Sequence, residues 1–237
     1  MNRRNMVGAG LVGLVIGGAV MALAGQGTKF SADPDRARIE KIVREYILAN
    51  PEIIPEAVDR LQGKQMAKVI SENRAAIETP FHGAWAGAPN GDVVLVEFFD
   101  YACGYCRKSN PDIERLLAED KKLKVVWREL PVLGPDSQAA AEVSLAAAKQ
   151  GKFKRFHDQL FAAGRPTASA VKAAQVATGI VPAPGSPEFH AEIEKNYELA
   201  RAINATGTPT FIVGDQVLQG AVGYEALKEA IAKARAS

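Results

Sequence analysis

The chain has 237 residues, a length that suffices for one well-formed core with an appendage, and it contains no internal repeat and no long low-complexity tract. Its formal net charge of +2 comes entirely from Arg3 and Arg4, so the remaining residues are neutral overall. A neutral chain gives no reason to expect nucleic acid or anionic lipid as a partner.

The first 24 residues are typical of an export signal. Two arginines precede an uncharged run from 6 to 24, which ends in the small-x-small pattern Ala22-Leu23-Ala24 of a signal-peptidase site. We expect a signal peptide over 1–24 and a periplasmic or otherwise exported protein. An uncleaved membrane anchor remains the alternative, because the run approaches the roughly 20 residues that cross a bilayer. Either outcome places the rest of the chain where disulfides persist.

Residues 30–78 are predicted to form an N-terminal helical segment. Asp33-Pro34 suits a helix start, and Asn50-Pro51 is expected to end the first helix before a second one begins near 51 or 55. Apolar residues recur at helical spacing along both helices. Because so short a pair cannot bury its apolar faces alone, it must pack on the main domain or form an oligomerisation stalk with other copies.

The main domain is predicted over 80–237, and a Gly- and Pro-rich junction at 79–92 leads into its first strand. The apolar run "VVLVEFF" (93–99) is typical of a strand buried on both faces, and a helix and the strand "KLKVVWREL" (122–130) follow it. These three elements predict a βαβ unit. A helical insert at about 134–205 comes next, then a hairpin turning at Gly214-Asp215 and a closing helix.

Both cysteines of the chain lie two residues apart, at Cys103 and Cys106, where the first strand meets its helix. Cys103 is therefore expected at a helix N-terminus, where free N–H groups and the helix dipole favour a thiolate and lower the pKa of the thiol. Cys106, one turn further, is expected to be shielded and to resolve mixed disulfides.

Two other readings of the cysteine pair are open. As a structural staple, so short a loop would stabilise the fold by only about 2 kcal/mol before strain is subtracted. As half of a zinc site, the pair would need further ligands from His82, His157 or His190, which are scattered in the sequence. A working dithiol is the reading favoured here, and we expect neither a bound metal nor a cofactor.

The strand–CxxC–helix start, the helical insert and the late "GTPTF" (207–211) resemble the thioredoxin-fold disulfide oxidoreductases of the bacterial Dsb group. The N-terminal "YILANPEIIPEAVDRLQ" (46–62) is similar to the helical segment of ScsC-type members. The resemblance implies an α/β thioredoxin fold with a helical insertion, preceded by a helical segment that can make the protein oligomeric.

The same resemblance implies roles for particular residues. Thr208-Pro209 matches the family's cis-proline position, which faces the cysteines and contacts substrate, and Gly104 and Tyr105 are expected to meet the substrate as well. Glu97 matches a buried acid that shuttles the proton of the second cysteine. The expected partners are unfolded or misoxidised proteins and a membrane protein that resets the dithiol.

The direction of exchange is left open by the sequence. Gly-Tyr between the cysteines and Thr before Pro209 resemble isomerases, and this favours isomerase or shuffling activity. A net dithiol oxidase is the alternative within the same chemistry. A copper- or zinc-binding module, or a chaperone, is the alternative from another class.

Overall fold

The computed structural model describes residues 34–236 and divides the chain after Val58 into two compact units. The expected signal peptide at 1–24 therefore lies outside the described residues. None of the helices within 34–236 combines the length and the apolar character that crossing a membrane requires.

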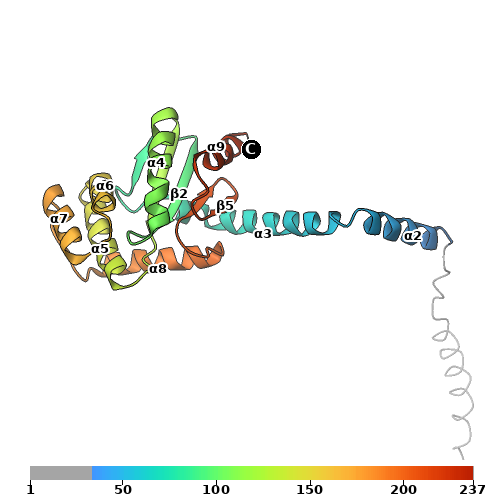
Figure 1. Cartoon of the computed structure of the whole chain (residues 1–237), viewed down its shortest axis with the longest axis horizontal. Helices are drawn as coiled ribbons and strands as arrows, with labels where there is room; N and C mark the ends of the chain where they lie inside the picture. Colours follow the sequence, from blue (N-terminus) through green and yellow to red (C-terminus); the bar gives the residue numbers. More distant parts are fainter. Residues whose placement is uncertain (1–33, 237) are drawn as a thin grey trace, which may run out of the picture. The chain divides into compact units, whose positions relative to one another are not determined.

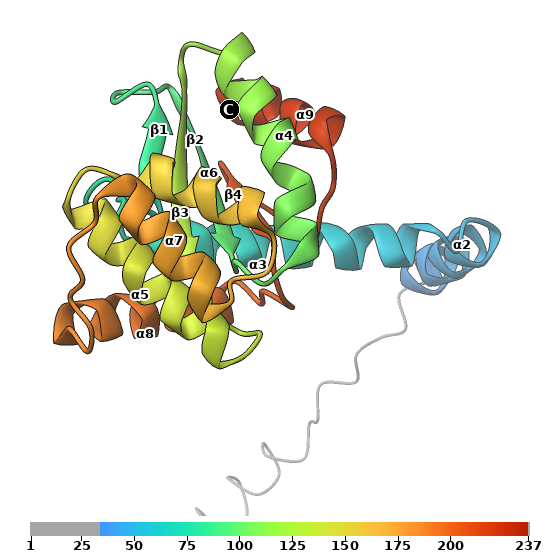
Figure 2. The same cartoon turned by 60° about the vertical axis from the view of Figure 1, so that its left-hand side comes forward.

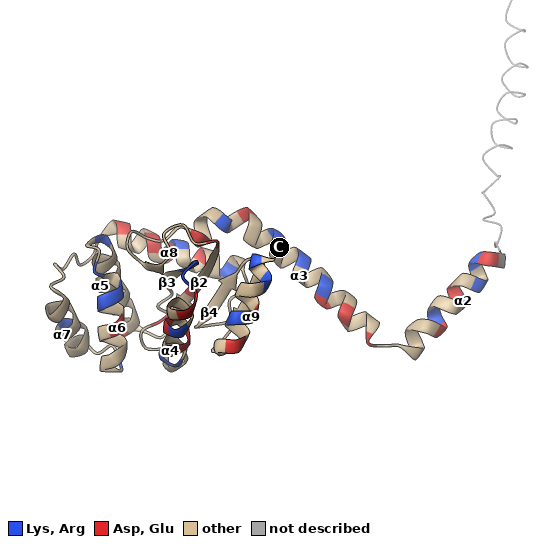
Figure 3. Cartoon of the chain, turned by 90° about the horizontal axis from the view of Figure 1, so that it is seen from above, with Lys and Arg blue, Asp and Glu red and all other residues tan. Residues whose placement is uncertain are grey.

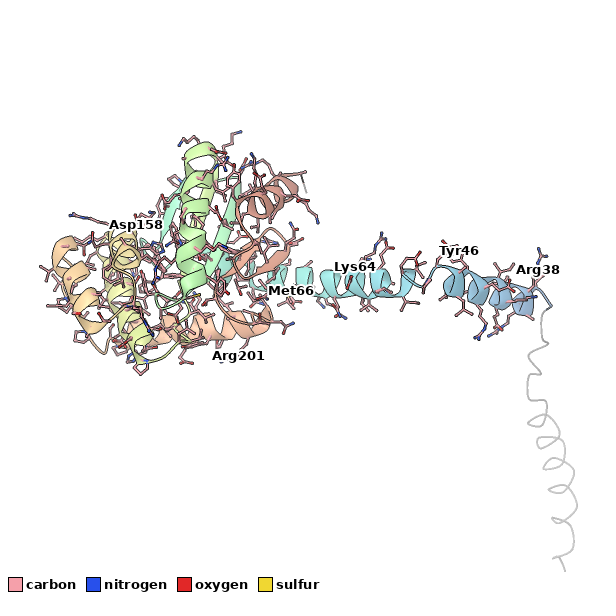
Figure 4. The ribbon with its side chains drawn as sticks, in the orientation of Figure 1. Arg38, Tyr46, Lys64, Met66, Asp158 and Arg201 are labelled. Atoms are coloured by element: carbon pink, nitrogen blue, oxygen red, sulfur yellow. The ribbon has the colours of Figure 1, made fainter. Side chains whose placement is uncertain are left out.

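The first unit contains α2 (Pro34–Ala49) and the first turns of α3 (Ile53–Glu78), as the helical pattern predicted. A turn at Asn50-Pro51 separates the two helices, since a proline disfavours helix in the residue before it. Large apolar side chains of these helices are exposed in the single chain, and Tyr46, labelled in Figure 4, is one of them.

The second unit is built on one mixed five-stranded sheet with the strand order β1-β3-β2-β4-β5. The strands are β1 (Trp85–Gly87), β2 (Val93–Phe99), β3 (Leu123–Glu129), β4 (Thr210–Val213) and β5 (Gln216–Gln219). β2 and β3 are parallel, whereas β4 and β5 form an antiparallel hairpin at one edge. The βαβ unit and the hairpin predicted from the sequence are both present.

Strand β1 was not predicted. It lies in the segment 79–92, which was expected to be only a junction, and it pairs antiparallel with β3 through the register Trp85↔Val126. The sequence signal fails here because three residues, the last of them a glycine, are too few to show an alternating pattern. The strand is stabilised by its ladder with β3.

The helices of this unit cover both faces of the sheet (Figures 1 and 2). They are α4 (Gly104–Glu119), α5 (Pro135–Lys149), α6 (Phe153–Ala163), α7 (Ala168–Thr178), α8 (Pro187–Ala202) and α9 (Tyr224–Arg235). One core cluster contains Leu95 and Phe99 together with residues of α4, α5, α6 and α9. The predicted helical insert corresponds to α5–α8. Along these helices acidic and basic residues are interspersed (Figure 3), in keeping with the balanced charge of the sequence.

The opposite face of the sheet carries a second core cluster around Val96, Phe98 and Ile212. The C-terminal half of α3 covers it through Ile70 and Ile77, which are fully buried, and Met66 (Figure 4) packs against its margin. Of the two alternatives expected for the N-terminal helices, packing on the main domain therefore holds for this half of α3. It belongs to the main domain, whereas the segment up to Val58 forms the other unit.

Candidate active site

Cys103 is the N-cap residue of α4, as the sequence predicted. Its sulfur accepts a hydrogen bond from the backbone N–H of Cys106, at 3.4 Å, and its own N–H donates to the carbonyl of Asp100 at 3.0 Å. A sulfur at this position faces the unpaired N–H groups and the positive end of the helix dipole. Both cysteines are buried and present as free thiols.

The loop that carries Cys103 is fixed by the carboxylate of Asp100, which is buried. One oxygen, Oδ1, accepts from the N–H of Ala102 at 2.8 Å, and the other, Oδ2, accepts from the N–H of Leu133 at 3.0 Å. The side chain thus connects the start of α4 with the segment that follows β3. This role was not foreseen from the sequence, because an Asp after a strand is common in loops of every kind.

The pKa of the Cys103 thiol is lowered to about 5. The largest cause is a hydrogen bond from the Cys106 thiol, and further hydrogen bonds come from the Thr208 side chain and from the backbone N–H groups of Cys106 and Tyr105. Burial acts in the opposite direction. Donors to the sulfur stabilise the thiolate more than the thiol, so this sulfur is ionised at neutral pH.

The second sulfur is in the opposite state. Cys106 is 0% exposed, and burial raises the pKa of its thiol, helped by its hydrogen bond to Cys103 and by the charge of Glu97. One cysteine of the pair is therefore an ionised nucleophile, and the other is a protonated thiol held beneath it.

Thr208, the residue before Pro209, lies directly against the first sulfur. The peptide bond between the two residues is cis, as predicted, and the Cys103 sulfur lies 3.2 Å from the Thr208 carbonyl oxygen, which accepts a hydrogen bond from the protonated form of the thiol. The Pro209 carbonyl accepts from the N–H of Gly220 at 2.8 Å, which joins this turn to the end of the β4–β5 hairpin. Among residues 34–236, the Thr208 N–H donates to no backbone carbonyl, and Thr208 is only half-buried.

The two residues between the cysteines are exposed. Tyr105 is 66% exposed, and outside the neighbouring backbone of α4 no atom lies within 4 Å of the position that a Cβ would take at Gly104. Val132 and Leu133, after β3, are also large apolar side chains left in solvent, at 47% and 55% exposure. The sequence reasoning missed these last two, although an apolar pair in a Pro- and Gly-containing loop is a signal that could have found them.

Glu97 lies in the middle of β2 and is 0% exposed, on the same face of the sheet as Leu95 and Phe99. Its Oε2 accepts a hydrogen bond from the indole N–H of Trp127 at 3.0 Å, and its Oε1 has no partner in the described part of the chain. Burial raises the pKa of this carboxyl to about 8, against the lowering effect of the Trp127 bond, and the charge of Cys103 raises it further.

Each of the three histidines has its own partners outside the dithiol. His82 contacts Glu188 at 3.2 Å, His190 contacts Glu142 at 3.3 Å, and His157 is buried among aromatic rings. Within residues 34–236 no group of three or more His, Cys, Asp or Glu side chains is placed to hold a metal ion. The ligands that the zinc reading needed are therefore not brought to the cysteines.

Comparison with known proteins identifies two family models in the chain. The DSBA-like thioredoxin domain matches residues 94–232, and the N-terminal domain of copper resistance protein ScsC matches residues 35–68. The first match contains both cysteines, Glu97 and the cis-proline. The second covers α2 and more than half of α3.

Several curated relatives are much longer than this chain. The Na(+)/H(+) antiporter NhaA 3 of Salinispora tropica is 31% identical over 159 residues, which make up 64% of this chain and 24% of the antiporter. The chain thus spans about a quarter of the length of the first curated relatives it matches. Disulfide bond formation protein D of Bacillus subtilis is 28% identical over 165 residues, covering 62% of this chain and 74% of that protein.

Solved structures resemble the chain over a larger share. A periplasmic thioredoxin-like protein from Salmonella enterica serovar Typhimurium has a TM-score of 0.65 at 29% identity, and the likeness covers 69% of this chain and 96% of that one. A linker-deletion mutant of Proteus mirabilis ScsC has a TM-score of 0.70 at 25% identity and covers 89% and 99%. With more than half of its residues matched, and with the expected fold, this chain belongs to the family of DsbA-like thioredoxin domains.

Proposed function

We propose that the protein is an exported thiol–disulfide oxidoreductase that exchanges disulfides with other proteins. The observation that carries this proposal is that the two neighbouring thiols differ in protonation at neutral pH. Cys103 has a pKa of about 5 and is ionised, whereas Cys106 is buried and protonated. Thiolates are the nucleophiles of disulfide exchange. The family match and the similarity to disulfide bond formation protein D support the same chemistry.

The exchange begins at Cys103. Its thiolate attacks one sulfur of a client disulfide, the client S–S bond breaks, and the other client sulfur leaves as a thiolate. The product is a mixed disulfide between Cys103 and the client. A second client thiolate can then attack the client sulfur of this bond and release Cys103, which rearranges the client without net oxidation or reduction.

Alternatively, Cys106 resolves the mixed disulfide. Once its proton has passed to the Glu97 carboxylate, the Cys106 thiolate attacks the Cys103 sulfur, and the client sulfur leaves as a thiolate. The client gains two electrons and the Cys103–Cys106 disulfide forms. In the oxidising direction the same steps run backwards, and Glu97 returns the proton to Cys106.

Thr208, Pro209, Tyr105 and Gly104 are proposed to bind the client chain. The half-buried Thr208 N–H, beside the first sulfur, is available to an extended client backbone, as in the addition of a strand to a sheet edge. The exposed Tyr105 ring offers an apolar contact, and the open space over Gly104 leaves room for the client main chain. Such contacts favour an extended client chain and give little preference for its sequence.

Isomerase or shuffling activity is the direction we favour, on the Gly-Tyr pair between the cysteines and on Thr before the cis-proline. A net oxidase is the second candidate, and the low pKa of Cys103 favours it, because a stable thiolate stabilises the reduced form and makes the disulfide more oxidising. Rates of regain of activity by a scrambled client and by a reduced client separate the two. An isomerase acts faster on the scrambled client, and an oxidase on the reduced one.

The N-terminal helices are proposed to join copies of this chain. Ile39, Ile42, Val43 and Tyr46 follow helical spacing on α2 and are all between 49% and 59% exposed. An apolar stripe of this kind is stable only when another helix covers it. The match of residues 35–68 to the ScsC N-terminal domain supports this role.

Solution mass tests the proposed self-association. Replacing Ile42 and Tyr46 by Asn should reduce an oligomer to the monomer, whereas replacing Lys41 and Glu45, an exposed ion pair of the same helix, should leave its mass unchanged. A monomeric wild-type chain would contradict the proposal.

Export and a membrane partner that resets the dithiol complete the proposed function. The pattern at 1–24 supports export, and one solved relative is named a periplasmic protein. Cell fractionation tests the location, since an exported chain appears outside the cytosol and, after cleavage, without its first 24 residues. The partner can be sought by trapping, because Cys106→Ser leaves the mixed disulfide with Cys103 unresolved.

A Cys103→Ser variant tests the chemistry itself. Refolding of a scrambled client should fall to the uncatalysed rate, because Cys106, the other cysteine of the chain, is fully buried and cannot reach the client. Refolding at the wild-type rate would instead favour a chaperone. Copper or zinc titration, with the thiols blocked as a control, tests a metal-binding module.

A further inference from the structure

Trp127 forms a buried hydrogen bond to the acid beneath the dithiol, and none of the steps above gives this residue a role. Its indole N–H donates to Glu97 Oε2 at 3.0 Å, and the two side chains are 2% and 0% exposed. The parallel ladder of β2 and β3 places the two residues in direct register, Glu97↔Trp127. The contact thus joins neighbouring strands on the face of the sheet that α4 covers.

The chemistry of the two groups favours one oxygen of the carboxyl as the carrier of the proton. An indole N–H is only a donor, so Glu97 Oε2 must be an acceptor whether the carboxyl is neutral or ionised. In the neutral acid the carbonyl oxygen is the stronger acceptor, so the indole bond at Oε2 favours the proton on Oε1. Oε1 is buried, and it has no hydrogen-bond partner among the residues that the structure describes.

We propose that Trp127 is a positioning residue, which holds Glu97 by Oε2 and so leaves Oε1 as the oxygen that exchanges a proton with Cys106. This deepens the proposed function and rests on it. In the resolving step the Cys106 thiol gives its proton to Oε1 of the ionised carboxyl, a form that the pKa of about 8 keeps as a minority at neutral pH. The resulting thiolate attacks the Cys103 sulfur while the client leaves as a thiolate. No further oxidant or reductant takes part.

The indole is itself held in place from several sides. Its backbone N–H donates to the Ala84 carbonyl at 3.0 Å, and its ring packs against Phe153 and His157, with ring centroids 5.6 Å and 5.1 Å away. A ring fixed in this way presents its N–H in one direction. The hydrogen bond is therefore preorganised and needs no rearrangement at the moment of proton transfer.

Other titratable groups surround Glu97, and an experiment must distinguish them. They are Cys103 and Cys106 of the dithiol, Tyr101 after β2, Glu129 of β3 and, across the indole ring, His157 of α6. Cys103 and His157 titrate on the acid side, since the pKa of His157 is lowered by its burial. Burial raises the pKa of Glu129 as well, so a Glu129 variant is the necessary control.

Trp127 fluorescence provides a readout that does not depend on activity. The chain has two tryptophans, so a Trp85→Phe variant leaves Trp127 as the single emitter. Its emission should change with pH in one step with a midpoint near 8, because ionisation of Glu97 alters the charge on the oxygen that the indole contacts. Glu97→Gln should remove the step, and Glu129→Gln should keep it.

The kinetic test uses the full chain in single turnover. Trp127→Phe keeps the ring and removes the N–H, so the rate at which Cys106 resolves a mixed disulfide should fall roughly three- to tenfold at neutral pH, the effect of one lost hydrogen bond. Trp127→His restores a ring N–H and should recover part of the rate. Trp85→Phe is the matched control and should react as the wild type does.

The outcomes separate this inference from the proposed function. A fluorescence step that survives Glu97→Gln, or a Trp127→Phe variant with an unchanged resolving rate, would overturn the positioning role while exchange through Cys103 remained active. If Cys103→Ser retained full exchange activity, the proposed function itself would fail. A loss of rate in Trp127→Phe beyond that of Glu97→Gln would also contradict the inference, because Trp127 is held to act only through Glu97.

Discussion

The Sγ of Cys103 and the carbonyl oxygen of Thr208 lie 3.2 Å apart, although 105 residues separate them in sequence. This contact brings the start of α4 against the cis-proline turn before β4, and it defines the site at which a client would meet the reactive sulfur. The carbonyl favours the thiol, since it can only accept, whereas the Thr208 side chain lowers the pKa of Cys103.

Replacing Thr208 by Val should raise the pKa of Cys103, because a hydrogen bond to the sulfur is lost while the shape of the side chain is kept. A bond to a charged sulfur of this kind corresponds to about one pH unit. The pH dependence of Cys103 alkylation measures the change. Thr206→Val, whose hydroxyl contacts Gln219 instead, is the matched control and should leave the midpoint in place.

Glu97 should make stability depend on pH. Its pKa is about 8 in the folded chain, against an ordinary value of 4.5, so the folded state keeps a proton that the unfolded state releases between these values. The free energy of unfolding should therefore fall as pH rises from 4.5 through 8, by an amount on the order of a few kcal/mol, and then level off.

Denaturant unfolding of Glu97→Gln at several pH values measures this contribution. The variant cannot ionise, so its free energy of unfolding, relative to that of the wild type, should rise across the same window and be greatest above pH 8. Glu198→Gln, at an exposed position of α8, should follow the wild type at every pH. Parallel curves for Glu97→Gln and wild type would show that the carboxyl is not neutral in the folded chain.

Arg128 is predicted to be the residue that fixes α3 to the sheet. It is 1% exposed, its guanidinium donates to the carbonyls of Ile77 and Thr79 at the end of that helix, and it pairs with Glu192 of α8 at 3.0 Å. A cation at a helix C-terminus satisfies carbonyls that lack partners within the helix.

Arg128→Met should lower the free energy of unfolding by about 3–5 kcal/mol, because it breaks the buried pair with Glu192, which keeps only the half-exposed Lys195, and leaves the Ile77 and Thr79 carbonyls without this donor. Arg201→Met, at the exposed end of α8 (Figure 4), should change it by no more than about 0.5 kcal/mol. Equal denaturation midpoints for the two variants would mean that α3 is held by its apolar contacts alone.

Gly104 and Gly214 should respond differently to Ala. At Gly104 a Cβ meets no atom within 4 Å, so Gly104→Ala should fold with unchanged or slightly higher stability. Gly214 has a φ of +57°, and a Cβ there would come within 2.8 Å of Ala234, so its replacement should destabilise the fold by more than about 1 kcal/mol. Thermal unfolding compares them, and a large loss at Gly104 would indicate a packing role that the structure does not show.

The main elements of the fold could be predicted because each has a local signal. The apolar run of β2, the helical spacing in 30–78 and the turn at Gly214-Asp215 depend on neighbouring residues alone, and all three agree with the structure. β1 could not be predicted, since its three residues are ordered by pairing with a strand about 40 positions away.

The candidate site divides in the same way. The place of Cys103 at a helix N-terminus follows from the strand that precedes it, and the cis bond before Pro209 follows from the family motif. Trp127 could not be found, because nothing in its own segment indicates that its N–H meets Glu97. The register of β2 against β3 decides that contact, and this register cannot be read from the sequences of the two separate strands.

The most direct test of the whole account is the rate of Cys103 alkylation by iodoacetamide as a function of pH, measured on the reduced full chain with Cys106→Ser as a parallel sample. The account predicts that the wild-type rate follows a thiolate with a midpoint near pH 5 and is already at its plateau at neutrality. A midpoint near 9, with a thiol that is slow to react at pH 7, would contradict it.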